Sequence, residues 1–343
     1  MKIKVAINGF GRIGRIAYRI ANERDDMEVV GINDLTDTKT LAYLLAHDSN
    51  YGNYQHKVEY DENNLIIDGT VIPIFAEKDP ALLPWGKLNV DVVIESTGRF
   101  TSGEAARAHI QAGAKKVVIS APTKSDDVKT IVIGANDEEL KNAGDIISNA
   151  SCTTNSVAAV MDIIDREFTV EKAMLTTVHS DTASQTLTDS PSKDLREGRA
   201  AAHNLVPTTT GAAIAVAKTV PNLVGKFDGL SVRVPTPVVS ISDVTMLLSR
   251  NTSKQEVNDL LIKSSHDPYY QGIVDVSDEP LVSTDYIGNS NSGIVDLELT
   301  NVVAGNLVKV VVWYDNEWGY SNRLVELVAD AGRLLYQKNQ STN

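Results

Sequence analysis

Apolar and polar residues follow one another along the first 150 positions in short blocks that predict strands separated by helices. Within one predicted strand, Val92, Val93 and Ile94 form an uninterrupted apolar run, which is typical of a parallel sheet buried on both faces. Residues Arg12–Arg24 repeat apolar side chains at helical spacing. This pattern predicts an α/β domain with a doubly wound sheet. The strands predicted here are Lys2–Ile7, Glu28–Asn33, Asp91–Ser96, Lys115–Ser120, Thr130–Ala135 and Asp145–Ser148.

Longer strands and fewer helices are predicted after residue 151, which favours an α+β domain built on a mixed or antiparallel sheet. A serine at 253 and a glutamate at 256 have the spacing of a capping box and predict a helix over Ser253–Ser265. A second helix, Gly319–Lys338, is expected to pack back on the first domain. The strands predicted here are Lys172–His179, Gly229–Val234, Val238–Leu248, Gly293–Val302 and Asn306–Tyr314.

Length and composition indicate a globular protein of two domains. A chain of 343 residues exceeds the size that one core usually supports. We expect residues 1–151 plus 316–343 to form one domain and residues 152–315 the other. The polar segment 180–210 has little periodicity, which is typical of a functional or interface segment.

Charge and cysteine content exclude several classes of protein. The formal net charge of −13 argues against nucleic-acid binding, which needs a basic surface. No apolar run approaches the roughly 20 residues that span a bilayer, so no membrane partner is expected. A single cysteine forbids an internal disulfide and fits a reducing compartment, so we expect a cytoplasmic protein.

A glycine-rich turn links the first predicted strand to the first predicted helix. Gly9, Gly11 and Gly14 form a Gly-x-Gly-x-x-Gly motif, and Asp34 ends the next strand. In a Rossmann domain these glycines permit the tight turn, the close approach of a pyrophosphate and the helix–strand packing. An acid at position 34 would bind the ribose hydroxyls and repel a 2′-phosphate, which favours NAD over NADP. The alternative is a glycine-rich turn without a ligand.

The only cysteine, Cys152, lies between the apolar pair Ile146-Ile147 and a predicted amphipathic helix. A helix N-terminus favours the thiolate, the nucleophilic form of cysteine. The alternative is a buried small hydrophobe, but the flanking hydroxyl and amide side chains of 151–155 are unsuited to a core. A nucleophilic sulfur together with a nicotinamide carrier predicts oxidation of an aldehyde through a thioester.

The remaining polar residues include one candidate base and no pattern typical of a metal site. Of six histidines, His179 ends a predicted strand in the same half of the chain as Cys152, although spacing alone favours a structural role for it. We interpret His47, His109 and His266 as exposed or satisfied histidines. The sequence has no paired cysteines and no His-Glu-x-x-His helix, so no metal site is expected.

Nearly the whole chain resembles the phosphorylating glyceraldehyde-3-phosphate dehydrogenase family. Its Ser-Cys-Thr-Thr-Asn block is highly specific for that family and its sugar-phosphate relatives. The resemblance rests on the blocks Asn8–Gly14, Asn33-Asp34, Glu95–Gly98, Ser148–Asn155, His179-Ser180, Arg199–Ala201, Pro207–Gly211, Arg233–Pro237 and Trp313–Tyr320.

This resemblance implies a reaction and a role for each matching residue. It implies that Cys152 attacks the aldehyde of D-glyceraldehyde 3-phosphate, that His179 acts as base and then acid, and that inorganic phosphate releases 1,3-bisphosphoglycerate from a thioester. Oxyanion stabilisation would come from the Cys152 N–H and from His179. The implied phosphate ligands are Thr182 and Arg233 for the substrate, and Ser151, Thr153, Thr210, Gly211 and Arg199 for inorganic phosphate. The implied cofactor contacts are Arg12 and Ile13 at the pyrophosphate, Thr97 and Ser120 along the groove, and Asn316 at the nicotinamide carboxamide.

Some residues and functions have an alternative interpretation. From the residues alone, Arg199 and Arg233 would be surface or salt-bridged arginines. Asp181 stands where many relatives have an aromatic residue, and an acid beside Thr182 would weaken or reshape the substrate-phosphate site. The resemblance implies a homotetramer. The alternative functions are erythrose-4-phosphate dehydrogenase, which hydrolyses its thioester, a semialdehyde dehydrogenase, and a non-metabolic binding or adhesion protein.

Overall fold

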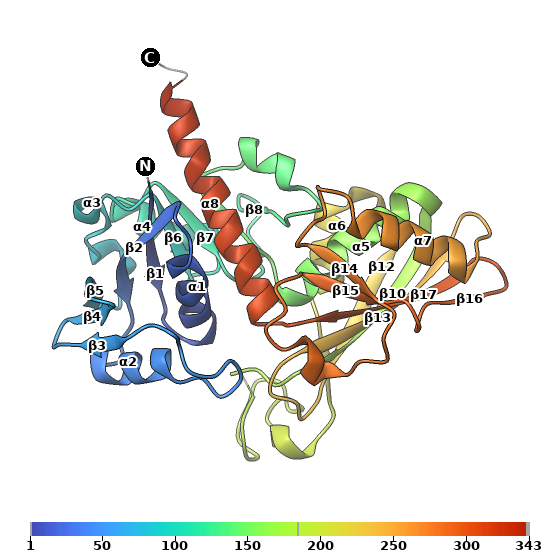
Figure 1. Ribbon diagram of the computed structural model, residues 1–343, viewed down its shortest axis with the longest axis horizontal. Coiled ribbons are helices and arrows are strands. Elements are labelled where there is room, and N and C mark those ends of the chain that lie inside the picture. Colours follow the sequence, from blue (N-terminus) through green and yellow to red (C-terminus); the bar gives the residue numbers. More distant parts are fainter. Residues whose placement is uncertain (1, 184, 341–343) are drawn as a thin grey trace. The chain divides into compact units, whose positions relative to one another are not determined.

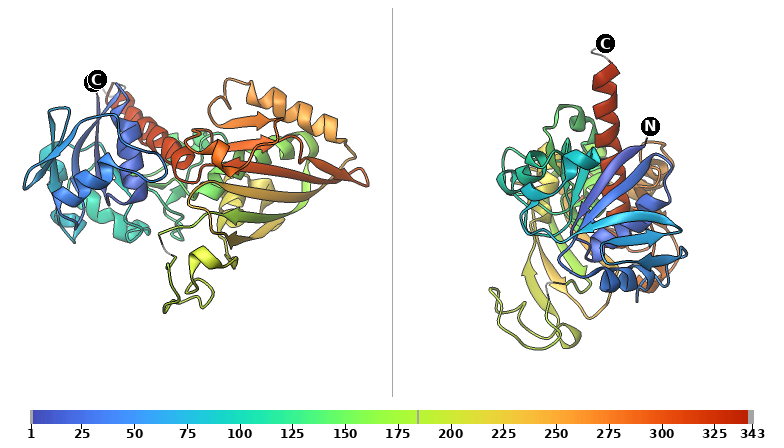
Figure 2. Two further views of the ribbon diagram at one scale, coloured as in Figure 1. Left: turned by 60° about the horizontal axis from the view of Figure 1, so that its bottom comes forward. Right: turned by 90° about the vertical axis from the view of Figure 1, so that its left-hand side faces the viewer.

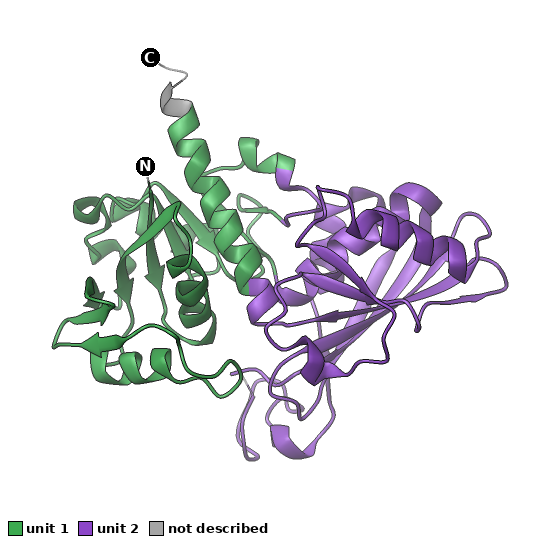
Figure 3. Cartoon of the chain, viewed as in Figure 1, with its two compact units in different colours: residues 1–131, 138–150, 321–343 green, residues 132–137, 151–320 purple. Residues whose placement is uncertain are grey.

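The computed structural model describes residues 2–183 and 185–340, which divide into two compact units (Figure 3). Unit 1 comprises residues 1–131, 138–150 and 321–343, and unit 2 comprises residues 132–137 and 151–320. Each unit contains a sheet of its own. Within the described residues, no helix is both long and apolar enough to cross a membrane.

Unit 1 is built on a nine-stranded sheet in the order β3-β4-β5-β2-β1-β6-β7-β9-β8. The strands from β5 to β8 pair in parallel, whereas β3 and β4 form an antiparallel edge. This arrangement confirms the predicted α/β fold class. The strands are β1 (Ile3–Asn8), β2 (Met27–Asn33), β3 (Val58–Tyr60), β4 (Asn64–Ile67), β5 (Thr70–Phe75), β6 (Val92–Glu95), β7 (Lys116–Ile119), β8 (Lys129–Thr130) and β9 (Ile146–Ser148).

Helices connect these strands, and the last helix returns to the sheet. Tyr336 on α8 donates a 2.6 Å hydrogen bond to Asp91, and Arg333 pairs with Asp26, so the C-terminal helix packs on the first domain as predicted. The helices are α1 (Arg12–Asn22), α2 (Thr38–Ala46), α3 (Trp85–Leu88), α4 (Gly103–Gln111) and α8 (Trp318–Gln340), with 3-10 turns η1 (Pro80–Leu82) and η2 (Asp137–Asn142).

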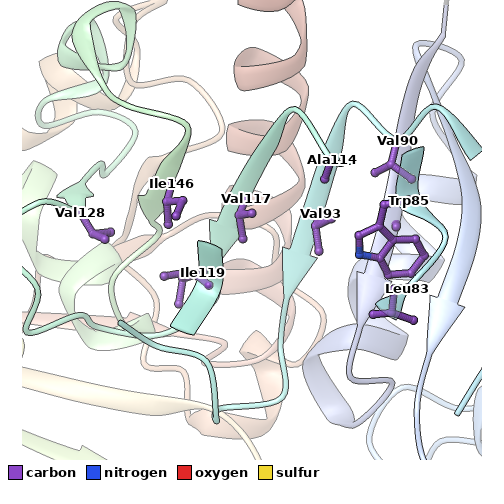
Figure 4. Close-up of a cluster of buried hydrophobic side chains, with 11 residues drawn as sticks. Leu83, Trp85, Val90, Val93, Ala114, Val117, Ile119, Val128 and Ile146 are labelled. Carbon is purple, nitrogen blue, oxygen red and sulfur yellow. The ribbon is translucent and has the colours of Figure 1, made fainter. Parts of the chain in front are cut away.

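One part of the unit 1 core lies against strands β6, β7 and β9 (Figure 4). Trp85 is fully buried there among aliphatic side chains such as Val93, Val117 and Ile146. Burial of each large apolar side chain contributes about 2 to 3 kcal/mol to the stability of the folded state. The apolar runs that predicted buried strands therefore form this core.

Unit 2 contains an eight-stranded mixed sheet in the order β11-β12-β10-β13-β17-β15-β14, with β16 paired to β17. Helices α5, α6 and α7 cover one face of this sheet (Figures 1 and 2). The strands are β10 (Val170–His179), β11 (Val206–Thr209), β12 (Phe227–Arg233), β13 (Ser240–Leu248), β14 (Val274–Ser277), β15 (Gly293–Asp296), β16 (Asn301–Val303) and β17 (Leu307–Tyr314). The helices are α5 (Cys152–Phe168), α6 (Ala212–Thr219) and α7 (Lys254–Ser265), with 3-10 turns η3 (Ala201–His203), η4 (Pro221–Leu223) and η5 (Ser283–Tyr286).

Two predicted strands end earlier than expected, and several short elements of the structure were not predicted. The strand predicted over Thr130–Ala135 is wrong beyond residue 130, because Gly134 has a φ of +87° and the Asn136 side chain caps a turn at Val132. The strand predicted over Gly293–Val302 is interrupted by a turn in which Asp296 accepts a hydrogen bond from Leu299 N. The hairpin β4–β5 was not predicted.

A recognisable signal for that hairpin was present in the sequence. Asp68 and Gly69 have φ values of +47° and +83°, and an Asp-Gly pair is favoured where both central turn residues need positive φ. By contrast, the predicted cap of α7 is confirmed, since the Ser253 hydroxyl accepts a 3.1 Å hydrogen bond from Glu256 N.

Candidate active site

A cleft of about 500 Å³ opens in unit 1 where the parallel strands β1, β2, β5 and β6 end. Ligands of doubly wound sheets bind at this edge, because the loops that follow the strands diverge there. The cleft is lined by Asn8, Gly9, Gly11, Asn33, Asp34, Leu35, Glu77, Lys78, Ser96, Thr97, Arg99 and Phe100.

The glycines of the β1–α1 turn meet different requirements. Gly9 has a φ of +92°, and a Cβ there would lie 2.7 Å from Thr97 N. A Cβ on Gly14 would lie 2.1 Å from the carbonyl oxygen of Gly9, so helix and turn pack in contact. A Cβ on Gly11 would meet no atom within 4 Å. Because Gly11 lines the cleft, this open space is what the close approach of a diphosphate requires.

Asp34 holds the turn and also faces the cleft. One carboxylate oxygen accepts a 2.7 Å hydrogen bond from Phe10 N, and the other accepts a 2.9 Å bond from Thr36 N. A half-buried carboxylate fixed at this position suits the recognition of ribose hydroxyls. The cleft, the open Gly11 position and this acid together fit a dinucleotide.

The remaining cofactor candidates of unit 1 occupy other positions. Arg12 is held in an ion pair with Asp48, and its guanidinium lies 5.8 Å from the ring centre of Tyr51. Ile13 lies half-buried in the first turn of α1. Ser120 follows β7 and donates its N–H to the carbonyl of Glu95 at 2.9 Å. Arg12 must therefore leave Asp48, or share its charge with it, to contact a pyrophosphate.

A buried polar network that was not predicted from the sequence holds residues that line the cleft. Trp85 Nε1 donates to His109 Nδ1 at 3.0 Å, so His109 carries its proton on Nε2 and donates to Glu95 at 3.0 Å. Glu95 also accepts from the side chain of Asn8 and from Thr97 N at 2.9 Å. The network thereby fixes two residues that line the cleft. The side chains of His109 and Glu95 are almost fully buried, and buried groups of this kind need hydrogen-bond partners. Only the structure reveals those partners.

In unit 2, Cys152 is the first residue of α5. Ser151 caps the helix, since its hydroxyl accepts a 3.1 Å hydrogen bond from Thr154 N. The N–H groups of the first helical turn have no partner within the helix, so those of Cys152 and Thr153 are positioned to bind a negatively charged oxygen. The side chain of Thr153 is buried and shares a 2.8 Å hydrogen bond with Tyr314.

His179 faces the sulfur of Cys152. Its Nε2 lies 3.4 Å from Sγ, and its Nδ1 lies 2.8 Å from the carbonyl oxygen of Ser180. A carbonyl only accepts, so Nδ1 carries the proton and the lone pair of Nε2 points at the thiol. The ring of Tyr314 packs edge-on against the imidazole, with 6.1 Å between the ring centres. The pair therefore has the geometry of a thiol and its base.

The environment of this pair favours a neutral thiol and a neutral imidazole, whereas the sequence predicts an ionised sulfur. Burial raises the pKa of the Cys152 thiol, while the Arg233 guanidinium and the N–H of Thr153 act to lower it. Loss of water around the sulfur thus outweighs the favourable charges. Burial and Arg233 lower the pKa of His179 to about 4, so this imidazole is neutral at pH 7 and is able to accept the proton of the thiol.

Arg233 supplies positive charge beside the pair. Strands β10 and β12 run in parallel with His179 directly opposite Arg233. Within the described part of the chain, the buried Nε and Nη1 of Arg233 have no hydrogen-bond partner. A buried guanidinium left unpaired is costly unless an anion binds to it. The position therefore fits a phosphate and contradicts the reading of Arg233 as a surface or salt-bridged arginine.

The side chain of Asn316 is also held in place in unit 2. Its Oδ1 accepts hydrogen bonds from Ser180 at 2.8 Å and from Ser240 at 3.2 Å. With the oxygen occupied, the amide N–H₂ group is the end that remains to donate to a ligand. Neither serine was a sequence-based candidate, because an isolated serine carries no functional pattern.

The other predicted phosphate ligands lie on separate local structures. Arg199 is largely exposed and pairs with Asp189 at 3.0 Å, so in this structure it is a salt-bridged surface residue. Thr210 and Gly211 form the N-terminus of α6, where Thr210 Oγ1 accepts from Ala212 N at 3.1 Å. Thr182 donates its N–H to the side chain of Gln185 at 3.2 Å. No metal-binding group of three His, Cys, Asp or Glu side chains occurs among the described residues.

Comparison with known proteins agrees with both units. Residues 3–103 match the family model "Glyceraldehyde 3-phosphate dehydrogenase, NAD binding domain", and residues 151–316 match "Glyceraldehyde 3-phosphate dehydrogenase, C-terminal domain". The chain is 56% identical over 325 residues to glyceraldehyde-3-phosphate dehydrogenase of Thermotoga maritima, covering 94% of this chain and 97% of the relative. It is 50% identical over 330 residues to the protein of that name from Geobacillus stearothermophilus, covering 96% and 98%. These matches extend over both units. The chain therefore belongs to the glyceraldehyde-3-phosphate dehydrogenase family.

Proposed function

We propose that this protein catalyses the NAD-dependent oxidation and phosphorylation of D-glyceraldehyde 3-phosphate to 1,3-bisphosphoglycerate, a reaction of glycolysis and gluconeogenesis. The observation that carries this proposal is the Cys152–His179 pair at the N-terminus of α5, with an unpaired guanidinium beside it. The relatives named above bear the name of this enzyme at up to 56% identity.

The first step is attack of Cys152 on the aldehyde carbon. The Sγ–carbon bond forms as the thiol proton passes to the lone pair of His179 Nε2, 3.4 Å away. The carbonyl π pair moves to oxygen, and the N–H of Cys152 at the start of α5 and the protonated His179 would stabilise that charge. The neutral imidazole of His179 has a lone pair free to accept the proton, but the raised pKa of the thiol and the lowered pKa of His179 oppose the transfer, so formation of the sulfur–carbon bond must drive it.

The second step converts the hemithioacetal into a thioester. NAD supplies the hydride acceptor for this oxidation. The proton that His179 took from the thiol first returns to the oxyanion and gives the hemithioacetal hydroxyl, and Nε2 of His179 takes it again as the hydride leaves the carbon. A phosphate oxygen then attacks the thioester carbonyl, the carbon–sulfur bond breaks, and the acyl phosphate leaves as Cys152 regains its proton.

Phosphate recognition is divided between two sets of residues. We assign Thr182 and Arg233 to the phosphate of the substrate, because the two free nitrogens of Arg233 suit a bidentate contact. Ser151, Thr153, Thr210, Gly211 and Arg199 are assigned to inorganic phosphate. The N-termini of α5 and α6 contribute to this set, and the positive end of a helix dipole favours the binding of an anion there.

The cofactor is assigned to the first domain. The turn of Gly9, Gly11 and Gly14 would receive the pyrophosphate together with Arg12 and Ile13, and Asp34 the adenosine ribose. Thr97 and Ser120 would line the groove, and Asn316 would donate its amide to the nicotinamide carboxamide. We propose residues 1–151 plus 316–343 as the NAD-binding domain and residues 152–315 as the catalytic domain; the compact units differ from these bounds at residues 132–137, 151 and 316–320.

Assembly and location complete the proposal. Leu187 and Leu195 in the segment 180–210 are 83% and 85% exposed, and apolar side chains in a long irregular segment suit a subunit interface. We infer a homotetramer, for which sedimentation should give four times the mass of one chain. A cytoplasmic location would keep the single thiol of Cys152 reduced.

The replacement Cys152→Ser tests the covalent mechanism. The purified variant should lose at least a thousandfold in NADH formation from D-glyceraldehyde 3-phosphate, because a hydroxyl near pH 7 is a far weaker nucleophile than a thiol. Near-normal turnover of the variant would contradict a sulfur nucleophile.

Omission of phosphate separates the alternatives. The wild-type protein should form NADH continuously with inorganic phosphate and stop after one turnover without it. Phosphate-independent turnover would instead favour a thioester-hydrolysing erythrose-4-phosphate dehydrogenase, and no NADH under any condition would favour a binding protein.

A further inference from the structure

An acidic side chain, Asp181, lies next to the anion site of unit 2 without taking part in any step above. It follows His179 by two residues. Strands β10 and β12 end at His179 and Arg233, and their pairing becomes irregular beyond these residues. Val234 N donates to the carbonyl of His179 and Asp181 N donates to that of Thr236, both at 2.9 Å. These bonds hold Asp181 beside the segment that follows Arg233.

Asp181 and Arg233 interact electrostatically, but their side chains form no ion pair among the described residues. Among the described residues, the buried Oδ1 of Asp181 has no hydrogen-bond partner, and Nε and Nη1 of Arg233 also have none. Burial raises the pKa of Asp181, and the Arg233 guanidinium acts to lower it. The same guanidinium acts on the Cys152 thiol and on His179. Asp181 is thus within electrostatic reach of the site without neutralising it by contact.

We propose that Asp181 is a specificity-determining residue that weakens binding of the substrate's phosphate at Arg233. This inference rests on the proposed function. A phosphate monoester carries between one and two negative charges at pH 7. A carboxylate within electrostatic reach of Arg233 repels that charge and shares the field of the guanidinium that we assign to bind it. The site consequently binds the phosphorylated aldehyde less tightly than Arg233 alone would.

The replacement Asp181→Asn removes the charge and keeps the shape. We expect the KM for D-glyceraldehyde 3-phosphate to fall about tenfold, which corresponds to about 1.4 kcal/mol. The KM for unphosphorylated D-glyceraldehyde should stay within twofold of the wild-type value, because that substrate has no phosphate to repel. The KM for inorganic phosphate should change less than that for the aldehyde phosphate.

Two further variants separate charge from structure. Asp181→Glu retains the charge and should keep the wild-type KM. Asp228→Asn removes an exposed carboxylate from the other end of β12 and controls for the change in net charge. If Asp181→Asn fails to fold, Asp181→Ser carries the same expectation.

The pH dependence gives an independent readout. As the pH falls, protonation of Asp181 should bring the wild-type KM toward that of Asp181→Asn, so the ratio of the two should shrink. Cys152, His179, Arg233 and the phosphate itself also face this site, but they are common to both proteins and cancel in the ratio.

An unchanged or raised KM for the phosphorylated aldehyde in Asp181→Asn would overturn this inference, as would an equal fall for both aldehydes or a fall confined to inorganic phosphate. These outcomes require an active enzyme. A wild-type protein that forms no NADH would contradict the proposed function instead, and the two failures are thereby distinguished.

Discussion

At the scale of single residues, the orientation of His179 depends on one backbone carbonyl. Ser180 O lies 2.8 Å from Nδ1 and keeps the proton there, which leaves Nε2 as the acceptor toward Cys152. The side chain of Ser180 points to Asn316. Successive side chains of an extended chain point to opposite sides. His179 therefore faces Cys152, while the side chain of the next residue, Ser180, holds the amide of Asn316 that we assign to the cofactor.

Loss of His179 should slow the chemical step. We expect His179→Asn to lower kcat by about 10²–10⁴-fold, the usual contribution of a general base. The KM for the aldehyde phosphate should change little, since Arg233 remains in place. Steady-state NADH formation measures both constants. His266→Asn is the matched control, because His266 is exposed at the end of α7, and an equal loss in both variants would remove His179 from the mechanism.

At the scale of elements, the register of two strands assembles the phosphate site. Arg233 lies 54 positions after His179, and the parallel pairing of β10 with β12 sets them side by side. A shift of one residue would turn Arg233 to the opposite face of the sheet.

A second contact between elements is sensitive to pH. His56 bonds Asp68 in the β4–β5 turn and Glu23 at the end of α1, both at 2.6 Å. The two carboxylates, Asp68 first, raise the pKa of His56 above its ordinary value of 6.5. The folded state therefore binds the proton more tightly than the unfolded chain does. The stabilisation is fully present below about pH 6.5 and is lost as the pH rises through the higher folded value.

The replacement His56→Gln should accordingly lower the melting temperature more at pH 5.5 than at pH 9. The corresponding change in the free energy of unfolding should be small, about 1 kcal/mol or less, because both carboxylates are largely exposed and screened by solvent. Thermal unfolding of both proteins at the two pH values measures it. His47→Gln is the control, since His47 contacts the uncharged side chain of Asn53. A larger effect of His56→Gln at pH 9 would reverse the assigned sign.

At the scale of the whole molecule, ligand binding should couple to stability. A dinucleotide that binds only the folded chain at a hundredfold excess over its Kd adds about 2.7 kcal/mol to the free energy of unfolding. We expect NAD to raise the melting temperature by several degrees and NADP to raise it less, because Asp34 repels the 2′-phosphate. Differential scanning calorimetry at equal concentrations measures both shifts. Equal shifts for the two nucleotides would show that Asp34 does not discriminate between them.

Local patterns in the sequence determined the main elements of this protein. Apolar runs predicted the buried strands β1, β6 and β7, and helical periodicity predicted α1 and α8. Gly-x-Gly-x-x-Gly predicted a turn whose three glycines meet the expected steric needs. The position of Cys152 at a helix N-terminus was likewise predicted. Each of these depends on neighbours within a few residues, and short-range sterics and spacing are encoded locally.

Only the tertiary structure decided which charges surround the sulfur. Burial in the fold raises the pKa of Cys152 against the effect of its own helix, and the free guanidinium of Arg233 comes from a distant strand. The tertiary structure also distinguishes two arginines that look alike in the sequence, since Arg199 is paired at the surface, whereas Arg233 is half-buried and its Nε and Nη1 have no partner among the described residues. The physical reason is that desolvation and long-range charge depend on every chain segment packed around a group, which no local pattern records.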